Sequence, residues 1–338
     1  MALSAAAANE AASAGSLERL VDATRPGMER VNAMILDRAR SHVELVPEIA
    51  RYLIDAGGKR LRPMLTIASS QLFGRTTGSE VNFAAAVEFL HNATLLHDDV
   101  VDESTMRRGR AAARMNWGNQ ASVLVGDFLL GQAFMMMVET GSIPALEVIS
   151  KAATVIAEGE VLQLSKTRDL TTTADDYNEV IRAKTAMLFE AATEVGAMAG
   201  GADASGRRAL RDYGRELGYA FQLVDDVLDF RGEAGMLGKN TGDDLREGKM
   251  TLPIIMALAV ASPAERELIV SALGNGRTGA AEIAGVIAVL NRHGALDRTL
   301  EQANTHARRA RESLKSLPPS EMKTLLGDVA EFTVLRAY

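Results

Sequence analysis

The sequence predicts an all-α protein that folds as a single large helical bundle. Apolar residues recur at steps of three and four from Leu17 onward, as in Met28, Val31 and Ile35. Valine, isoleucine and threonine never alternate with polar residues over a segment bounded by hairpin turns, and no repeat of fixed length occurs. The length of 338 residues would allow two average domains. Because the helical pattern is continuous, we expect one domain over residues 17–338.

The helices can be followed in order along the chain. Residues 1–16 are rich in Ala and supply almost no large side chain for a core, so we predict a disordered tail there. One helix begins near Val81 and ends in the acidic segment 97–103, a second runs from about Ser122 to Glu139, and a third begins near Arg208. Glycines suited to helix ends stand at Gly57-Gly58, Gly74, Gly141 and Gly200-Gly201.

The composition excludes several classes of protein. It is 47% apolar, 24% charged and 4% aromatic, as in an ordinary soluble globular protein. Without cysteine the chain has no disulfide framework or thiol nucleophile, so we expect a cytoplasmic location. A net charge of −7 argues against nucleic-acid binding. We find no secretory signal and no apolar run near the roughly 20 residues that span a bilayer, and therefore predict no transmembrane segment.

Two acidic motifs of the form D-D-x-x-D carry the strongest chemical signal. They are Asp98-Asp99-Val100-Val101-Asp102 and Asp225-Asp226-Val227-Leu228-Asp229. On a helix the first and last aspartates of each motif lie one turn apart on the same face, where like charges repel. A divalent cation would reverse that cost, and Mg²⁺ prefers oxygen ligands of this kind. One copy alone is equally well explained as a solvated helix end. However, one copy is expected by chance only about 0.07 times in this length, and two independent copies far more rarely, so the repeat favours a metal site.

Basic residues accompany the acidic motifs. They lie in the run Gly57-Gly58-Lys59-Arg60-Leu61-Arg62-Pro63 and in Arg107-Arg108-Gly109-Arg110. Either run alone would more often be a solvated patch. Beside a helix N-terminus and a cation-binding cluster, however, such residues suit a diphosphate held by metal on one side and by arginine on the other.

The sequence resembles the trans-isoprenyl diphosphate synthases from about Leu17 to its C-terminus. The shared motifs stand in family order: G-G-K-x-x-R-P at 57–63, H-D-D-x-x-D at 97–102 followed by R-R-G, Lys184-Thr185, F-Q-x-x-D-D-x-x-D at 221–229, and G-K-x-x-G-D-D-L at 238–245. The resemblance, closest to bacterial octaprenyl and decaprenyl synthases, implies a helical bundle around a central cavity, a homodimer, and a product used for quinone side chains. The substrates would be isopentenyl diphosphate and an allylic diphosphate.

The resemblance also assigns roles to individual residues. It implies that about three Mg²⁺ ions are held by Asp98, Asp99, Asp102, Asp225, Asp226 and Asp229. The allylic diphosphate would contact Arg107, Lys184 and Lys239, and isopentenyl diphosphate would contact Lys59, Arg62, His91 and Arg108. Lys184, Thr185 and Gln222 would stabilise the allylic cation. His91 lies two turns before Asp98 on the same helix face, which agrees with its role, although a lone histidine on an apolar helix is also well explained as a core residue.

The chain length of the product is predicted from residues beyond the first motif. Short-chain members of the family carry bulky aromatics at the fifth or fourth residue before that motif, where this chain has Ala93 and Thr94. Ala93 lies about 7 Å down the helix from Asp98, so we expect the tail to pass it and the product to reach about C40 to C50. Met137 is the candidate tunnel end, although it would also suit an ordinary core. So greasy a product suggests transient membrane contact on release.

Three other functions remain as alternatives. A shorter-chain synthase, making C15 to C20 products, would use the same motifs. A class I terpene cyclase should have a different second metal motif and an aromatic-lined pocket. A non-catalytic regulatory subunit of a heteromeric synthase would be expected to have lost acidic motifs, and both are intact.

Overall fold

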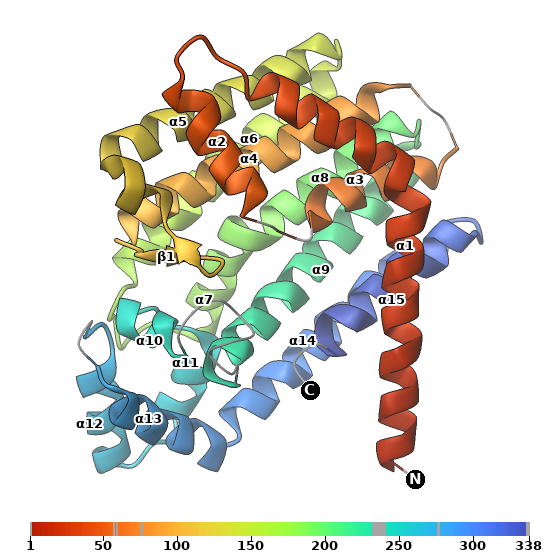
Figure 1. Ribbon diagram of the computed structural model, residues 1–338. Helices are drawn as coiled ribbons and strands as arrows, with labels where there is room; N and C mark the ends of the chain where they lie inside the picture. The colour runs from red at the N-terminus through yellow and green to blue at the C-terminus, as the bar shows by residue number, and fades with distance from the viewer. Residues whose placement is uncertain are drawn as a thin grey trace.

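The molecule is a row of packed α-helices with a smaller group of short helices at one end (Figure 1). The structure is a computed structural model that describes residues 2–56, 58, 60–74, 77–231, 241–275 and 278–335, with side chains in the first helix described from Gly15 onward. The helices are α1 (Ala2–Arg38), α2 (Leu45–Asp55), α3 (Leu61–Gln71), α4 (Ser79–Val101), α5 (Ala113–Glu139), α6 (Ile143–Ser165), α7 (Ala174–Ile181), α8 (Met187–Ala199), α9 (Ala204–Arg231), α10 (Asp243–Glu247), α11 (Leu252–Leu258), α12 (Pro263–Ala272), α13 (Ala280–Arg292), α14 (Ala295–Ser313) and α15 (Glu321–Leu335). The all-α prediction is confirmed.

The long helices follow the order α5, α4, α8, α9, α14 and α15, each contacting the next. Their apolar faces form two core clusters. One surrounds α9 and α14 and includes Tyr213 and Leu217, and the other lies between α4, α5 and α6 and includes Phe89 and Leu129. Helix α8 contributes to both clusters, so the ends of α4 and α9 are fixed relative to each other through it.

The predicted helix ends agree with the structure at several glycines. Gly74, Gly141 and Gly201 follow α3, α5 and α8, and all three have positive φ, a conformation that glycine adopts without steric cost. Gly57 lies outside the described residues. The expected helices near Val81, Ser122 and Arg208 are α4, α5 and α9, although α5 begins nine residues earlier than expected, at Ala113.

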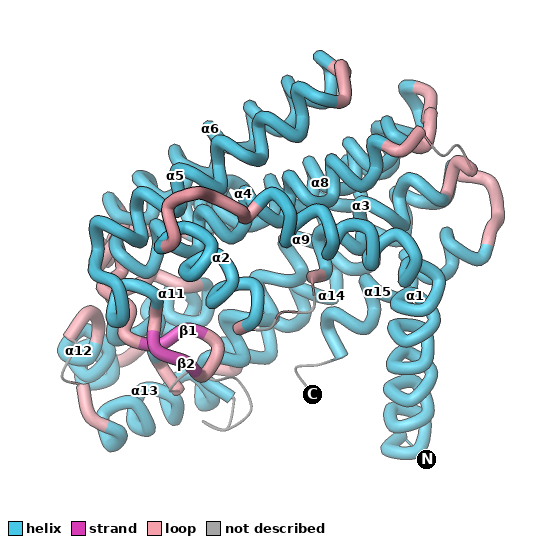
Figure 2. Tube along the Cα trace, turned by 45° about the horizontal axis from the view of Figure 1, so that its top comes forward, coloured by secondary structure: helices cyan, strands magenta, loops and turns pink. Residues whose placement is uncertain are grey.

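A short β-hairpin and a π-helical turn were not predicted. Met106–Arg107 (β1) and Arg110–Ala111 (β2) form a hairpin, visible in Figure 2, whose two-residue loop is Arg108-Gly109 with φ of 52° and 75°. Positive φ at both loop residues fits the type I′ turn that tight hairpins favour. A π-helical turn, η1 (Arg182–Ala186), joins α7 to α8. Such turns are rare and often occur at functional sites.

The N-terminal end of α1 projects away from the rest of the molecule in both views. The helix extends back through the alanine-rich segment to Ala2, in keeping with the high helix propensity of alanine. Isolated helical segments of this length are marginal in water, so the disordered tail stays a prediction about solution behaviour.

Helix α5 qualifies the expectation about membrane segments. Within the residues described, it alone has the length and hydropathy of a membrane-spanning helix. However, it packs along α4, with Val125, Leu129 and Ala133 buried, and Gly118 interrupts its helical geometry with φ of 83°. Core helices of soluble proteins meet the same criterion, so this feature is weak evidence for a membrane span.

Candidate active site

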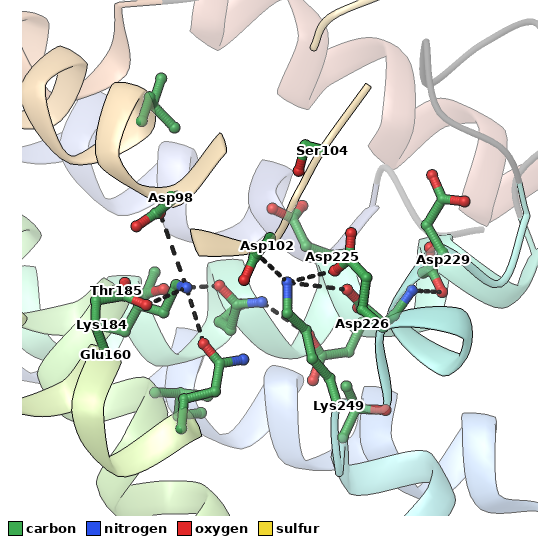
Figure 3. A pocket seen from close by; sticks show the side chains of 18 of the residues that line it. Asp98, Asp102, Ser104, Glu160, Lys184, Thr185, Asp225, Asp226, Asp229 and Lys249 are labelled. Carbon is green, nitrogen blue, oxygen red and sulfur yellow. Dashed lines mark hydrogen bonds and ion pairs between the residues drawn. The ribbon is translucent and has the colours of Figure 1, made fainter. Parts of the chain in front are cut away.

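A cavity of about 1310 Å³ opens where the C-terminal ends of α4 and α9 approach each other. Both acidic motifs contribute to its lining. The hairpin β1–β2, helices α3, α6 and α7, the turn η1 and the segment around α10 complete the walls. Figure 3 shows Lys184 beside Asp98 and Lys249 beside Asp102, with the aspartates of α9 in the same pocket. The sequence motifs are therefore brought together in one site.

The three aspartates of the first acidic motif lie in two different environments. Asp98 and Asp102 line the cavity, whereas Asp99 is fully buried and does not. The Asp99 Oδ1 atom accepts hydrogen bonds from Nε and Nη2 of Arg107 at 2.8 and 2.6 Å. Adjacent helical residues point about 100° apart, which separates Asp99 from its neighbours. Asp99 thus holds Arg107 at the rim of the site, a geometry that differs from the direct metal contact expected for it.

Lys184 faces the first motif from the π-helical turn. Its Nζ donates hydrogen bonds to Glu160 at 2.7 Å and Gln163 at 2.8 Å, both on α6, and lies 3.8 Å from Asp98 Oδ2. Burial raises the pKa of Asp98 and of Glu160, although Lys184 acts in the opposite direction. Two acids therefore share one cation, and a further positive charge would be well accommodated here.

The turn η1 is held close to its neighbours by two glycines. A Cβ atom on Gly159 of α6 would lie 2.6 Å from the Cβ of Ala183, and one on Gly218 of α9 would lie 2.5 Å from the Cα of Ala186. Only glycine allows these approaches. They place α6 and α9 directly against the turn that carries Lys184 and Thr185.

The second acidic motif is part of a hydrogen-bonded chain. Asp225, Asp226 and Asp229 all line the cavity, but Asp226 is only 2% exposed. Tyr177 donates its hydroxyl to Asp226 Oδ2 at 2.5 Å, and Gln222 donates Nε2 to Oδ1 at 2.8 Å. Gln222 Oε1 accepts in turn from the Thr185 hydroxyl at 2.7 Å. Burial raises the pKa of Asp226 to about 8, while the two hydrogen bonds favour its charged form.

Lys249, which the sequence did not single out, joins the first motif to the segment around α10. Its Nζ lies 3.0 Å from Asp102 Oδ2, 2.6 Å from Glu247 Oε2 and 4.0 Å from Asp244 Oδ1. Burial alone would lower the pKa of Lys249, but these carboxylates raise it above its usual value. Lys249 and Lys184 in turn hold the pKa of Asp102 below its usual value against the effect of burial.

A basic wall borders the acidic region. Arg62 lies with Nη1 3.4 Å from His91 Nε2 and with its guanidinium 4.3 Å from the centre of the Phe189 ring. Burial lowers the pKa of Arg62 to about 10, and Glu88 partly opposes this. Burial, followed by Arg62 and Arg108, lowers the pKa of His91 well below its usual value, so the imidazole is neutral at neutral pH.

The hairpin loop presents Arg108 to the same wall. A Cβ atom on Gly58 would lie 2.9 Å from Arg108 Nη1, so the loop before α3 passes close to the end of the Arg108 side chain. Arg108 itself has φ of 52°, a conformation that non-glycine residues adopt at some cost. The backbone thus accepts local strain to place a guanidinium in the cavity wall.

The remaining predicted residues are placed in different ways. Lys59 and Lys239 lie outside the described residues. Thr94 lines the cavity, and its hydroxyl donates to the His91 carbonyl at 2.8 Å. Ala93 and Met137 are buried in the core cluster between α4 and α5 and do not line the described cavity. Their assignment to chain-length control stays a prediction.

The described residues do not form a complete metal site from protein side chains alone. In the part of the chain that the structure describes, no group of three or more His, Asp or Glu side chains is gathered closely enough to hold an ion. The cavity-lining aspartates approach from two sides and leave room between them, however. Mg²⁺ typically takes one or two carboxylates and completes its shell with water and substrate phosphate oxygens, so this donor set fits a cation bound together with its substrate.

Comparisons with known proteins agree with this arrangement. Residues 43–290 match the family model described as Polyprenyl synthetase. Octaprenyl diphosphate synthase of Escherichia coli (strain K12) is 44% identical over 95% of this chain and 99% of its own length. A polyprenyl synthase from Caulobacter crescentus CB15, solved with calcium and isoprenyl diphosphate, is 48% identical with a TM-score of 0.92, covering 95% of this chain and 98% of its own. A decaprenyl diphosphate synthase from Rhodobacter capsulatus is 47% identical with a TM-score of 0.89, covering 95% and 99%.

Proposed function

Since the chain belongs to the polyprenyl synthetase family, we propose that the cavity between α4 and α9 joins isopentenyl diphosphate to an allylic diphosphate. The enzyme is a trans-prenyl diphosphate synthase that makes long-chain products, as the octaprenyl and decaprenyl relatives do. The observation that carries the proposal is the pair of aspartate motifs facing each other across one cavity beside a wall of arginines.

Mg²⁺ is the cofactor that we propose, with about three ions per site. The carboxylates that would hold it are Asp98 and Asp102 on α4 and Asp225, Asp226 and Asp229 on α9, while Asp99 would act through Arg107. Support comes from the cavity that both motifs line and from the calcium present in the Caulobacter relative. When bound, the metal supplies Lewis-acid stabilisation of the departing diphosphate.

The two substrates would lie on opposite sides of the cavity. Arg107 and Lys184, with Lys239, suit the allylic diphosphate because both described residues are tied to the first acidic motif. Arg62, His91 and Arg108, with Lys59, suit isopentenyl diphosphate. Neutral His91 can donate a hydrogen bond to a phosphate oxygen, and the arginines supply the charge.

In the reaction, the allylic C–O bond breaks and its electron pair leaves with the diphosphate. Arg107 and Lys184 stabilise the charge that develops on the leaving group. The double bond of isopentenyl diphosphate then supplies the electrons of the new C–C bond, and the proton that must be lost passes to the released diphosphate. Gln222, oriented by Thr185 and Asp226, stabilises the cation through its amide oxygen, together with the carbonyl oxygens of Lys184 and Thr185.

A homodimer is proposed from an apolar surface on α5 and α6. Large apolar side chains stand exposed there, among them Leu124 at 66%, Val138 at 62%, Ile143 at 70% and Val161 at 66%. Such a surface is unusual on a monomer and suits a self-complementary interface. We further propose a cytoplasmic enzyme whose product becomes a quinone side chain and leaves by transient membrane contact.

The test is a product assay with the purified protein, Mg²⁺, isopentenyl diphosphate and farnesyl diphosphate. We expect polyprenyl diphosphates of about C40 to C50, because Ala93, small and about 7 Å from Asp98 along α4, would not block a growing chain that reaches it. A main product of C15 or C20 would support the shorter-chain alternative. Absence of turnover would support a regulatory subunit, and cyclic hydrocarbons would support a terpene cyclase.

A further inference from the structure

A second cavity, of about 540 Å³, lies between η1, α7, α9 and α14. None of its lining residues lines the active-site cavity. Its volume falls within the range of small-ligand pockets. Helix α9 contacts both η1 and α14, and so joins two of the other three elements around the cavity.

The charges in this second cavity are mainly positive. Arg182 on η1 and Arg309 on α14 line it, and neither makes an ion pair within the portion of the chain described. The single acid in the lining, Glu216, already has two partners. Its Oε2 lies 2.8 Å from His306 Nδ1, and its Oε1 lies 3.4 Å from Arg215 Nε. In a protein with a net charge of −7, two unpaired guanidiniums in one concavity are well suited to an anion.

The cavity also has a rigid polar surface. The Tyr219 ring stacks on the His306 ring with centroids 4.7 Å apart, and this pair joins α9 to α14. Asn178 and Gln302 add side-chain amides to the lining. Guanidiniums, amides and a phenol hydroxyl are the donors that recognise phosphate oxygens.

Three of the four elements around this cavity also carry active-site residues. On α7, Asn178 follows Tyr177, which bonds Asp226. On η1, Arg182 precedes Lys184 by two residues, and on α9, Tyr219 precedes Gln222 by three. The second cavity therefore borders the backbone segments that carry Lys184 and Gln222.

We propose that the second cavity is a regulatory site for a small phosphate-class anion, of which inorganic diphosphate is the natural candidate, held between Arg182 and Arg309. The reaction itself releases diphosphate, so the product would control the enzyme from a site apart from the one where it forms. An anionic phospholipid headgroup presents the same chemistry from another source. The small, concave volume favours the soluble anion.

Histidine-selective NMR tests binding, because the chain has five histidines and two of them report on the two cavities. His306 lines the second cavity and His91 the active site. Inorganic diphosphate, added without metal, should shift the His306 resonances along a binding curve of their own. Arg309→Gln should weaken that curve about tenfold or more while the His91 curve stays unchanged. Arg298→Gln, an exposed arginine on the same helix outside the cavity, is the matched control.

Kinetics test regulation. At saturating substrate concentrations, added inorganic diphosphate should still lower kcat in the unmodified enzyme and in Arg298→Gln. In Arg309→Gln and Arg182→Gln that inhibition should largely disappear, with basal kcat unchanged. A His306 signal that ignores diphosphate, or that moves only with phosphatidylglycerol vesicles and not with phosphatidylcholine vesicles, would overturn the proposal. So would inhibition that is equal in all four proteins.

Discussion

Replacing the buried cation Lys249 by methionine should destabilise the metal-free protein strongly. The Nζ atom is surrounded by Asp102, Asp244 and Glu247 at distances of 2.6–4.0 Å. Lys249→Met keeps most of the side-chain volume but leaves these three carboxylates without their cation. Breaking a buried ion pair from one side typically costs about 3–5 kcal/mol. With an unfolding entropy of about 2.1 cal/mol/K per residue, the expected fall in Tm is about 4–7 °C.

The pH dependence gives the sharper test. Lys249 has a raised folded-state pKa, so its contribution is complete below its unfolded pKa of about 10.4 and is lost only as pH rises through the higher folded value. Asp102 has a lowered pKa, so its contribution is present at neutral pH and is lost as pH falls through that value. In Lys249→Met, protonation relieves the repulsion among the acids. The variant should therefore regain stability, relative to the unmodified protein, as pH falls from neutral.

Thermal and urea unfolding at neutral and mildly acidic pH, with and without Mg²⁺, would measure the stability difference between Lys249→Met and the unmodified protein. Added Mg²⁺ should reduce the stability difference between Lys249→Met and the unmodified protein, since it supplies the missing positive charge. The control is Lys315→Met, because Lys315 is 76% exposed and its Nζ lies 3.7 Å from Glu312. Its free energy of unfolding should change by no more than about 0.5 kcal/mol. A loss below about 1 kcal/mol in Lys249→Met, or a loss that does not vary with pH, would refute this reasoning.

Three further predictions concern catalysis and product length. Asp98→Ala or Asp225→Ala should lower turnover by several orders of magnitude with the helical circular dichroism unchanged, and near-normal turnover would contradict the metal assignment. In steady-state kinetics, Arg108→Ala should raise KM for isopentenyl diphosphate more than for the allylic substrate, and Arg107→Ala the reverse; equal effects would refute the division. Ala93→Phe should shorten the main product, measured by chromatography, to about C15 to C20, and an unchanged product would exclude a role for Ala93 in length control. Because Ala93 is fully buried, the substitution should also cost about 1–3 kcal/mol of stability through overpacking.

The sequence predicted the parts of the site that are encoded locally. An apolar helix that ends in D-D-x-x-D predicts both the helix and the position of its carboxylates, and α4 and α9 are where they were expected. Asp98 and Asp225 line one cavity as the paired motifs required. Periodicity and motif spacing together therefore suffice for these elements.

The residues that depend on tertiary contacts were not predictable in the same way. Lys249 follows a glycine after a five-residue helix, and only the folded chain brings it to Asp102, 147 residues earlier. Tyr177 likewise meets Asp226 across 49 residues. Asp99 illustrates a different limit, since the motif does not say which of two adjacent aspartates faces the cavity. The strands of the hairpin, two residues each, are too short to show the alternation of apolar and polar residues that predicts a strand.

The π-helical turn makes the number of residues between α7 and α8 a functional property. A π turn corresponds to one residue inserted into an α-helix. Deleting one residue from 182–186 would restore a regular helix, and α7 and α8 would keep nearly the same relative orientation because the wide turn takes up the extra residue. Lys184 and Thr185 lie within the turn itself, so the deletion would move them away from Glu160 and Gln222. Substitutions on the outer face of this turn can therefore vary, but its length cannot, and loss of a single codon here should be as damaging as loss of an aspartate.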